Sequence, residues 1–593
     1  MHRPAHITGS NPAHQQGAGL LIFFVVLILA GSAFLLTHTP PETGRVQSEN
    51  RTSEALAAAK QALLAYAVGY YSSEEPGRHG ILPCPEINTS PYLGDGRNAI
   101  QCGPRHTNSI GRLPWYTLKI PPPHDGAGEC LWYALSGGFY NNVTSYMTND
   151  DTPGMFELYD ASGNLLAGNT PEDRVVAVVI APGGPLAGQN RSAQSGLPCK
   201  QSGELVDITD YLESFSGIDN TTVSDTQATR DQVDSFITAT GLGNNPGLND
   251  RIITITSAEI FDAIKKRPAL YDDKIGQLGL ELGQCLIDYA GVAALAINSP
   301  GGGPPGGPPG GPPGGPGGPG GPGGPGGPGG PGGPGSGGAD YQLCLDNCEA
   351  DRQLCFAAAN SGPDRATCNQ TRNNCRRACR NSAITDDDYR LPWPAPVDLN
   401  SDYRVDTNYI GLDDDSEGYF GRLPYDISAT SDILGIDLDA DPDTADTLFT
   451  ECNLSGANPE LFTLWQHWKD HWFYVLGNHF EPPLNNTPNN ICNNNNACPQ
   501  VNNVRYAAIL IFSGERINNQ LRRTNETEDP DPPLAQSKAD LANYLEGSNL
   551  GDYPDVPDAA GNGNYGVYDG VNPHNDRLFC INSAMNNVTE CTP

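Results

Sequence analysis

Apolar residues along the chain are concentrated in one long run near the N-terminus. The nineteen residues from Ala18 to Leu36 are uncharged and mostly apolar, and the residues before them are mostly polar. As a helix rising about 1.5 Å per residue, this run is about 28 Å long, just enough to cross a hydrocarbon core of about 30 Å. We therefore predict a transmembrane helix over residues 18–37, preceded by a leader over residues 1–17.

A second helix is predicted by the segment RTSEALAAAKQALLAYAVGYY, residues 51–71. It contains good helix formers, and Thr52 or Ser53 is placed to cap the first turn. Apolar residues recur at intervals of seven and form one stripe: Leu56, Leu63 and Tyr70. We expect this stripe to pack on a sheet. Pro40 and Pro41 predict a break between the two helices, because proline lacks the backbone donor that a helix interior needs.

The segments around and after this helix occur twice, in the same order. The pairs are QALLAYA at 61 and QCLIDYA at 284, GRLPW at 111 and GRLPY at 421, LWYALSG at 131 and HWFYVLG at 471, RVVAVVIAPG at 174 and RYAAILIFSG at 505, YLE at 211 and at 544, and NDRIITITS at 249 and NDRLFCINS at 575. Six matches in one order indicate an internal duplication. The first two of these segments lie farther apart in the second copy than in the first. This difference predicts an insertion near residues 298–385.

Apolar and β-branched runs predict two strands near the end of each copy. They cover residues 175–180 and 252–256 in the first copy, and 507–512 and 578–581 in the second. The fold class that follows is α+β, with a long helix packed on a mostly antiparallel sheet, twice. We assign residues 51–275 to the first copy, and residues 276–297 with 386–593 to the second.

The insertion contains two different segments. Residues 298–340 are almost entirely Gly and Pro, which predicts a flexible linker. Residues 341–382 contain six cysteines in a palindromic spacing, which would place three on one face of each of two antiparallel helices. We predict a helical hairpin stapled by nested disulfides, one of 15 connectivities: Cys355–Cys368, Cys348–Cys375 and Cys344–Cys379. A zinc site is the alternative, which the lack of a C-x2-C pair and of an accompanying His disfavours.

Charge and cysteine content narrow the setting. The net charge is -35, from 34 Lys and Arg against 69 Asp and Glu. Because nucleic-acid binding depends on neutralising phosphates with basic side chains, we exclude a nucleic-acid partner. Sixteen cysteines in a chain with an apolar N-terminal segment favour an oxidising compartment.

Two patterns are candidates for metal binding. In DLDADPDTAD, residues 437–446, carboxylates recur as in a calcium loop: Asp437, Asp439, Asp441, Asp443 and Asp446. An exposed acidic loop is the alternative, because Pro442 and Leu448 stand where the EF-hand has glycine and glutamate. His467 and His471 are spaced to chelate a metal from one helical face, but Trp468 stands where a metalloprotease has its glutamate. We expect a packed aromatic helix there, and no cofactor beyond the candidate calcium.

The junction between the leader and the apolar run resembles that of type IV prepilins and pseudopilins. Gln15-Gln16-Gly17 is followed at once by apolar residues. The resemblance implies that a prepilin peptidase cuts after Gly17 and leaves Ala18 as the first mature residue. Major pilins have glutamate at the fifth mature position, where this chain has Ile22, whereas minor pilins and tip pseudopilins can lack it. A plain membrane anchor and a signal peptide cleaved near residues 31–33 are the alternatives.

Other motifs extend the resemblance over most of the chain. LPCP, GRLPW, GECLWYALSG, VVAVVIAPG and NDR are similar to segments of large bacterial proteins with prepilin-type N-termini. The resemblance implies two pilin-like heads in a minor pilin or tip pseudopilin-like subunit of a type IV pilus or type II secretion pseudopilus. It also implies other pilin or pseudopilin subunits as partners, and a single-pass location in the bacterial inner membrane with a periplasmic ectodomain, which reaches the pilus or cell surface after assembly. We expect no catalytic residues and no enzyme activity. A membrane-anchored or secreted adhesin or glycan-binding protein is the alternative.

Overall fold

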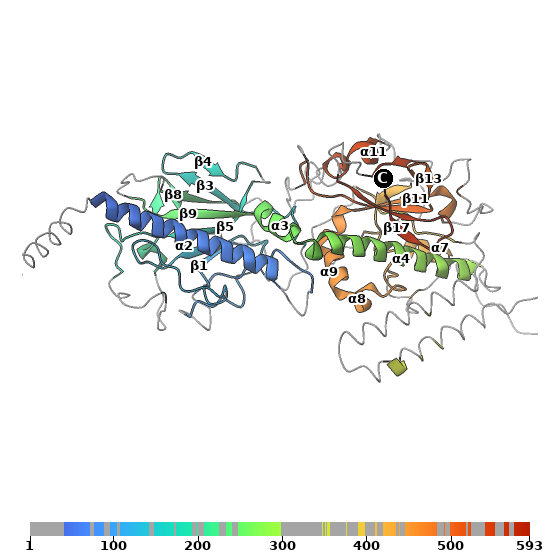
Figure 1. Cartoon of the computed structure of the whole chain (residues 1–593), viewed down its shortest axis with the longest axis horizontal. Helices are drawn as coiled ribbons and strands as arrows, with labels where there is room; N and C mark the ends of the chain where they lie inside the picture. Colours follow the sequence, from blue (N-terminus) through green and yellow to red (C-terminus); the bar gives the residue numbers. More distant parts are fainter. Residues whose placement is uncertain are drawn as a thin grey trace, which may run out of the picture.

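The computed structural model describes most of residues 41–297 and 389–592. Within these ranges the longer gaps cover residues 71–75, 88–94, 141–146, 192–206 apart from Cys199, 225–232, 240–246, 398–408, 412–418, 435–444 apart from Leu438, 483–497 apart from Cys492, 523–539, 552–562 and 568–574. Between 298 and 388 only Asn347, Ala350, residues 353–355 and Cys375 are described. The chain forms two lobes side by side (Figure 1), here called the first lobe (41–271) and the second lobe (272–592).

The first lobe is a long helix on a sheet. Helix α2, Pro41–Gly69, lies along the seven-stranded sheet. Its strands are β1 Ser109–Arg112, β2 Trp132–Leu135, β3 Phe156–Asp160, β4 Leu165–Ala167, β5 Val175–Ala181, β8 Asp234–Thr238 and β9 Arg251–Thr256. Strand β5 is flanked by β2 and β9, both antiparallel to it, and β3 pairs with the start of β5 and with β4 and β8. The smaller elements are η2 Ile208–Asp210, β6 Ser214–Phe215 and β7 Ile218–Asp219.

The second lobe has the same plan. Helix α4, Asp272–Ile297, lies on an antiparallel sheet of order β10-β11-β14-β16-β17. The strands are β10 Phe420–Arg422, β11 Trp472–Leu476, β14 Ala508–Phe512, β16 Arg577–Ile581 and β17 Val588–Glu590. Around them lie α7 Ser428–Leu434, α8 Leu454–Ala457, α9 Pro459–Trp468, η4 Lys469–His471, η5 Asn478–Phe480, η6 Leu541–Asn543, α11 Gly547–Gly551 and the small sheet of β12 Gln500–Val501, β13 Val504–Arg505 and β15 Asn564–Tyr565. Helix α3, Ser257–Lys265, and the turn η3, Pro268–Leu270, connect the lobes.

Four strands of each lobe pair in the same order and register. In the first lobe Arg112 lies opposite Trp132, which lies opposite Ile180, which lies opposite Ile252. The equivalent residues of the second lobe are Arg422, Phe473, Ile511 and Leu578. The sequence match of LWYALSG with HWFYVLG is one residue off, because it equates Trp132 with Trp472. The order of the repeated segments is therefore also the order of the strands in space.

Each lobe also buries an equivalent arginine with the same hydrogen bonds. In the second lobe the Arg522 guanidinium donates to the carbonyl oxygens of Gly514, Asn543 and Tyr544 and to Oε1 of Gln520. In the first lobe Arg191 donates to the equivalent acceptors, which are the carbonyl oxygens of Gly183, Asp210 and Tyr211 and Oε1 of Gln189. The duplication thus includes a buried polar network as well as apolar strands.

A second arginine lies above the tyrosine ring of each network. The Arg112 guanidinium lies 4.6 Å from the ring centroid of Tyr211, and the Arg422 guanidinium lies 4.6 Å from that of Tyr544. Each tyrosine ring is thereby packed between two arginines, since Arg191 and Arg522 lie 4.7 and 4.9 Å from the same centroids. A delocalised guanidinium favours this stacking on an aromatic face.

The predicted strands are confirmed, and the predicted helix start is wrong. The four expected strands correspond to β5, β9, β14 and β16. Helix α2 begins at Pro41, because proline is compatible with the first turn of a helix, where its missing donor would have no partner. Thr52 is consequently inside the helix, where its hydroxyl donates to the Ser48 carbonyl. Leu56 and Leu63 are buried as predicted, and Tyr70 follows the end of the helix.

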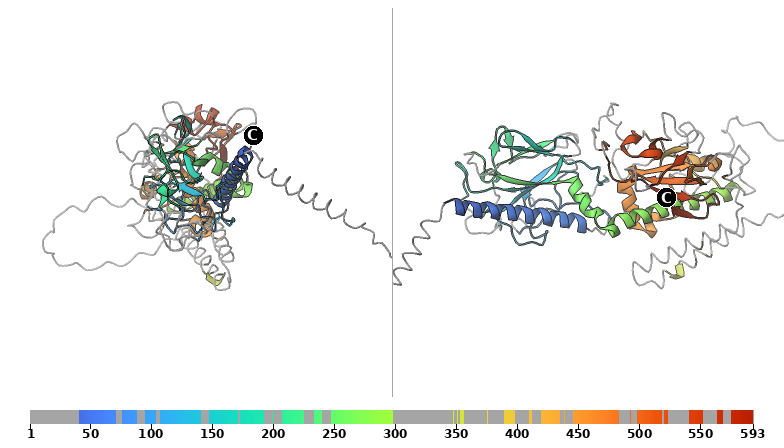
Figure 2. Two further views of the ribbon diagram at one scale, coloured as in Figure 1. Left: turned by 90° about the vertical axis from the view of Figure 1, so that its left-hand side faces the viewer. Right: turned by 45° about the horizontal axis from the view of Figure 1, so that its top comes forward.

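Helices α2 and α4 cover the same side of their sheets, as the right-hand view of Figure 2 shows. One apolar core continues across the junction, with Leu63 of α2, Phe261 of α3, Leu282 of α4 and Trp468 of α9 among its members. The other face of each sheet buries a core of its own. Glycines bring α4 close to its sheet, since a Cβ on Gly279 would lie 2.4 Å from the Phe579 ring.

Five disulfides lie within the described residues: Cys84–Cys102, Cys130–Cys199, Cys285–Cys452, Cys492–Cys498 and Cys580–Cys591. Cys355 and Cys375 of the predicted hairpin are also disulfide-bonded. The pairing of its six cysteines and the Gly/Pro linker lie outside the described residues. No helix among the described residues is long and apolar enough to span a membrane, and the apolar run 18–37 is not among them.

Candidate functional site

Charged side chains from both lobes meet in a buried cluster at the junction. Asp150 and Asp151 come from the segment between β2 and β3 of the first lobe, and His471 comes from η4 at the start of β11 in the second. The His471 Nε2 atom lies 3.0 Å from Oδ2 of Asp151 and 3.7 Å from Oδ1 of Asp150. The three side chains are 8%, 4% and 0% exposed, in chain order. We call these residues the junction triad.

Hydrogen bonds next to the triad join the two lobes. The Thr148 N–H donates to Nδ1 of His467 at 2.9 Å, and the Asn149 side-chain amide donates to the His467 carbonyl at 2.9 Å. Asn149 also accepts the Asp151 N–H through its side-chain oxygen, which shapes the turn that carries both aspartates. The first lobe thus docks its turn on the C-terminal end of α9.

Basic residues from both lobes surround the carboxylates. Lys265, at the end of α3, places Nζ 2.7 Å from Oδ2 of Asp150 and 3.2 Å from Oε1 of Glu515. Arg516 of the second lobe lies 3.8 Å from Oδ1 of Asp151. Burial alone would raise the pKa of Asp151, but His471 and the nearby arginines outweigh it and hold that pKa well below its usual range. Both aspartates are therefore ionised in the folded protein, since Lys265 in the same way lowers the pKa of Asp150 against the effect of burial.

Several polar atoms of the triad remain without a hydrogen-bond partner among the described residues. They are Oδ1 of Asp150, Oδ1 of Asp151 and Nδ1 of His471, whereas Nε2 of His471 contacts Oδ2 of Asp151 at 3.0 Å. The His471 ring is packed against Trp468, Phe512 and Tyr544, with centroids 4.9, 5.9 and 5.8 Å away. Because a buried polar atom without a partner costs free energy, this arrangement favours a bound ligand.

The two histidines predicted as a candidate pair do not act together. Helix α9 ends at Trp468, and the chain enters strand β11 at Trp472, so the packed helix that we expected covers only part of the segment. Burial, together with Arg78 and Lys469, lowers the pKa of His467 well below its usual value. His467 is therefore a neutral acceptor for Thr148, whereas His471 faces the aspartates.

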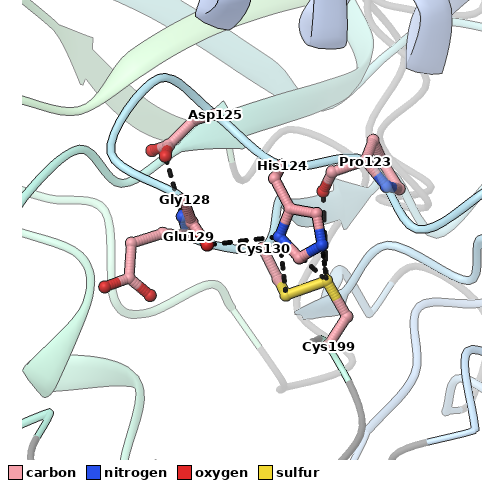
Figure 3. The surroundings of a disulfide bond; sticks show 7 residues. All are labelled: Pro123, His124, Asp125, Gly128, Glu129, Cys130 and Cys199. Atoms are coloured by element: carbon pink, nitrogen blue, oxygen red, sulfur yellow. Dashed lines mark hydrogen bonds between the residues drawn. A yellow bond between two sulfur atoms is a disulfide. The ribbon is translucent and has the colours of Figure 1, made fainter. Parts of the chain in front are cut away.

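A second group of potential ligands surrounds a disulfide in the first lobe (Figure 3). His124 Nδ1 lies 3.8 Å from Sγ of Cys130 and 3.7 Å from Sγ of Cys199, and it contacts the Gly128 carbonyl at 3.2 Å. Because the two sulfurs are bonded to each other, neither is a thiolate ligand. The oxidised site is thus a disulfide beside an imidazole.

The other predicted site residues lie mostly outside the described residues. This applies to the processing positions Gly17 and Ala18, and to four members of the candidate calcium loop: Asp437, Asp439, Asp441 and Asp443. The fifth member, Asp446, is buried, and its Oδ1 accepts the Leu438 N–H at 2.9 Å. The calcium site stays a prediction. The junction triad was not predicted, because Asp150 and Asp151 belong to no motif and have no match in the second copy.

Comparisons with known proteins leave the family of this chain open: no protein-family model, no curated protein and no solved structure matches it.

Proposed function

We propose that this protein is a structural assembly subunit, a minor pilin or tip pseudopilin-like component of a type IV pilus or a type II secretion pseudopilus. The observation that carries the proposal is helix α2. It begins at Pro41, shortly after the apolar run 18–37, and packs along an antiparallel sheet through Leu56 and Leu63. A subunit of this class needs such a helix, because it joins the membrane-embedded assembly helix to the head.

The two lobes support a projecting role. Both have the helix-on-sheet plan of a pilin-like head, but the sequence has one apolar run of membrane-spanning length, at residues 18–37. The junction contacts and the shared core join the second lobe to the first. A single membrane helix would therefore carry two rigidly joined heads away from the membrane.

The location that we propose is the bacterial inner membrane before assembly, with the lobes in the periplasm, and the pilus or cell surface afterwards. The five disulfides of the described residues favour an oxidising compartment. Ile22 occupies the position where a major pilin has glutamate. In pilins that glutamate pairs with the N-terminal ammonium of a neighbouring subunit, so a subunit without it suits the tip.

The test is N-terminal mass spectrometry of the chain expressed with and without a prepilin peptidase. We expect a mature chain that starts at Ala18, carries an N-methyl group and appears only when the peptidase is present. A Gly17→Val variant is the control, since it should leave the leader attached. A chain starting near Phe34, or still at Met1 in the presence of the peptidase, would refute the proposal and favour the secreted or membrane-anchored adhesin.

A further inference from the structure

We propose that the junction triad, Asp150, Asp151 and His471, binds one divalent transition-metal ion of the zinc type that bridges the two lobes. The inference comes from side-chain geometry alone and does not depend on the assembly role proposed above.

The positions of the ligand atoms suit such an ion. One ligand atom from each of the three residues lies within 4.8 Å of the others, and all three residues are buried. Bonds of about 2.1 Å in a tetrahedral zinc site place neighbouring ligand atoms about 3.4 Å apart. The distances from His471 Nε2 to the two carboxylates, 3.0 and 3.7 Å, lie on either side of this value. Binding requires only small movements of the side chains.

The unpartnered atoms point to the same conclusion. Oδ1 of Asp150 is buried and has no hydrogen-bond partner among the described residues, and Nε2 of His471 lies 3.7 Å from it and 3.0 Å from Oδ2 of Asp151. A divalent ion would accept a lone pair from each of the three residues.

The surroundings supply the outer contacts of a metal site. Lys265 forms an ion pair with Oδ2 of Asp150, so Oδ1 of the same carboxylate can bind the ion. Such a contact to the second oxygen fixes the orientation of a metal-binding carboxylate. The donor set also selects the ion, because imidazole suits zinc and its neighbours, whereas calcium and magnesium prefer oxygen ligands only. The site therefore differs in specificity from the acidic stretch 437–446.

The experiment uses the full-length chain purified in detergent and stripped with EDTA. We expect it to take up one equivalent of Zn²⁺ by elemental analysis and to unfold at a higher temperature once reloaded. Co²⁺ is the spectroscopic probe, and it should give the visible absorption of a four-coordinate site with an imidazole ligand. Asp151→Asn and His471→Gln should each abolish the absorption. Asp439→Asn, in the acidic stretch, and His124→Gln, beside the disulfide, are the matched controls and should retain it.

The proposal is overturned if the stripped chain takes up no stoichiometric Zn²⁺ or Co²⁺ and its unfolding temperature is unchanged. The triad would then be a structural contact between the two lobes. Uptake that persists in both triad variants would equally overturn it. If these variants do not fold, X-ray absorption of the wild-type Co²⁺ form decides, and a first shell without imidazole nitrogen rejects the site. None of these readings needs an assembled filament, so a failure here is distinct from a failure of the mass-spectrometric test.

Discussion

Replacing Arg522 by alanine should weaken the second lobe much more than the first, which Arg522 affects through its charge near Asp150 and Asp151. The guanidinium is fully buried and donates to three backbone carbonyls and to Gln520. Alanine would leave these acceptors buried without donors, at about 1 to 3 kcal/mol for each group that water cannot reach. Since neighbouring groups relax, we expect a total loss of about 3 to 5 kcal/mol, a large part of the roughly 5 to 15 kcal/mol that stabilises a typical domain.

Hydrogen exchange measured by mass spectrometry can read each lobe separately. At about 1.4 kcal/mol per tenfold change, the expected loss accelerates exchange of the β14 amides by about 100-fold or more. Exchange in β5 of the first lobe should stay within about fivefold of wild type, because effects of distant sites are nearly independent. Arg191→Ala should produce the reverse pattern, since Arg191 makes the equivalent contacts in the first lobe.

Two further variants test whether the hydrogen bonds of Arg522, rather than its charge, stabilise the second lobe. Arg522→Lys keeps the charge but loses the planar fork, so it should recover less than half of the stability. Arg51→Ala removes an exposed arginine from α2 and should change neither lobe by more than about 0.5 kcal/mol. If Arg522→Ala accelerates β14 exchange by less than about fivefold, the duplicated network does not stabilise the lobes as argued.

Two other predictions concern the junction and α4. Because the pKa of His467 is lowered, the unfolded state binds a proton below about pH 6.5 that the folded state does not. The free energy of unfolding should therefore decrease as the pH is lowered below about 6.5, by up to about 1.4 kcal/mol per pH unit. His467→Asn, which keeps an acceptor for Thr148, should flatten this slope in urea titrations at pH 7.5 and 5.5; equal slopes would contradict it. Gly279→Ala should lower stability by about 1 to 3 kcal/mol through overpacking against Phe579. Gly44→Ala, in open space on α2, should not lower it, and equal effects in thermal unfolding would reject the close-approach argument.

The elements that could be predicted are those whose signal is local. Strands β5 and β14 are buried at every position, so both appear as uninterrupted apolar runs. The start of α2 was missed because a proline that stops a helix from its interior also suits the first turn. Matching motifs indicated the duplication, but not why YLE and NDR recur. In the structure, Oε2 of Glu213 accepts the backbone N–H groups of Asn249 and Asp250, so the motifs are two parts of one buried network.

The junction triad could not be predicted, because its residues come together only in the folded chain and leave no local signal. Asp151 and His471 are distant in sequence, Asp151 belongs to no repeated motif, and the repeat matches His471 with Leu131, which is not a histidine. Their contact depends on how α3 positions the two lobes, and no periodicity in the chain specifies that arrangement. Features present in both copies could be inferred by comparing the copies. A site formed between the two lobes occurs once, so that comparison cannot reveal it.

The interrupted second lobe has a consequence for biosynthesis. Helix α4 ends at Ile297, but strand β16, which packs against it, begins only at Arg577. At about 5 to 20 residues per second, a ribosome needs on the order of 15 to 60 seconds to make the roughly 280 residues between them. During that time α4 lacks strands β16 and β17, which pack against it, whereas the first lobe has all of its strands by Thr256. The nascent chain should therefore depend on chaperones mainly while the second lobe is incomplete.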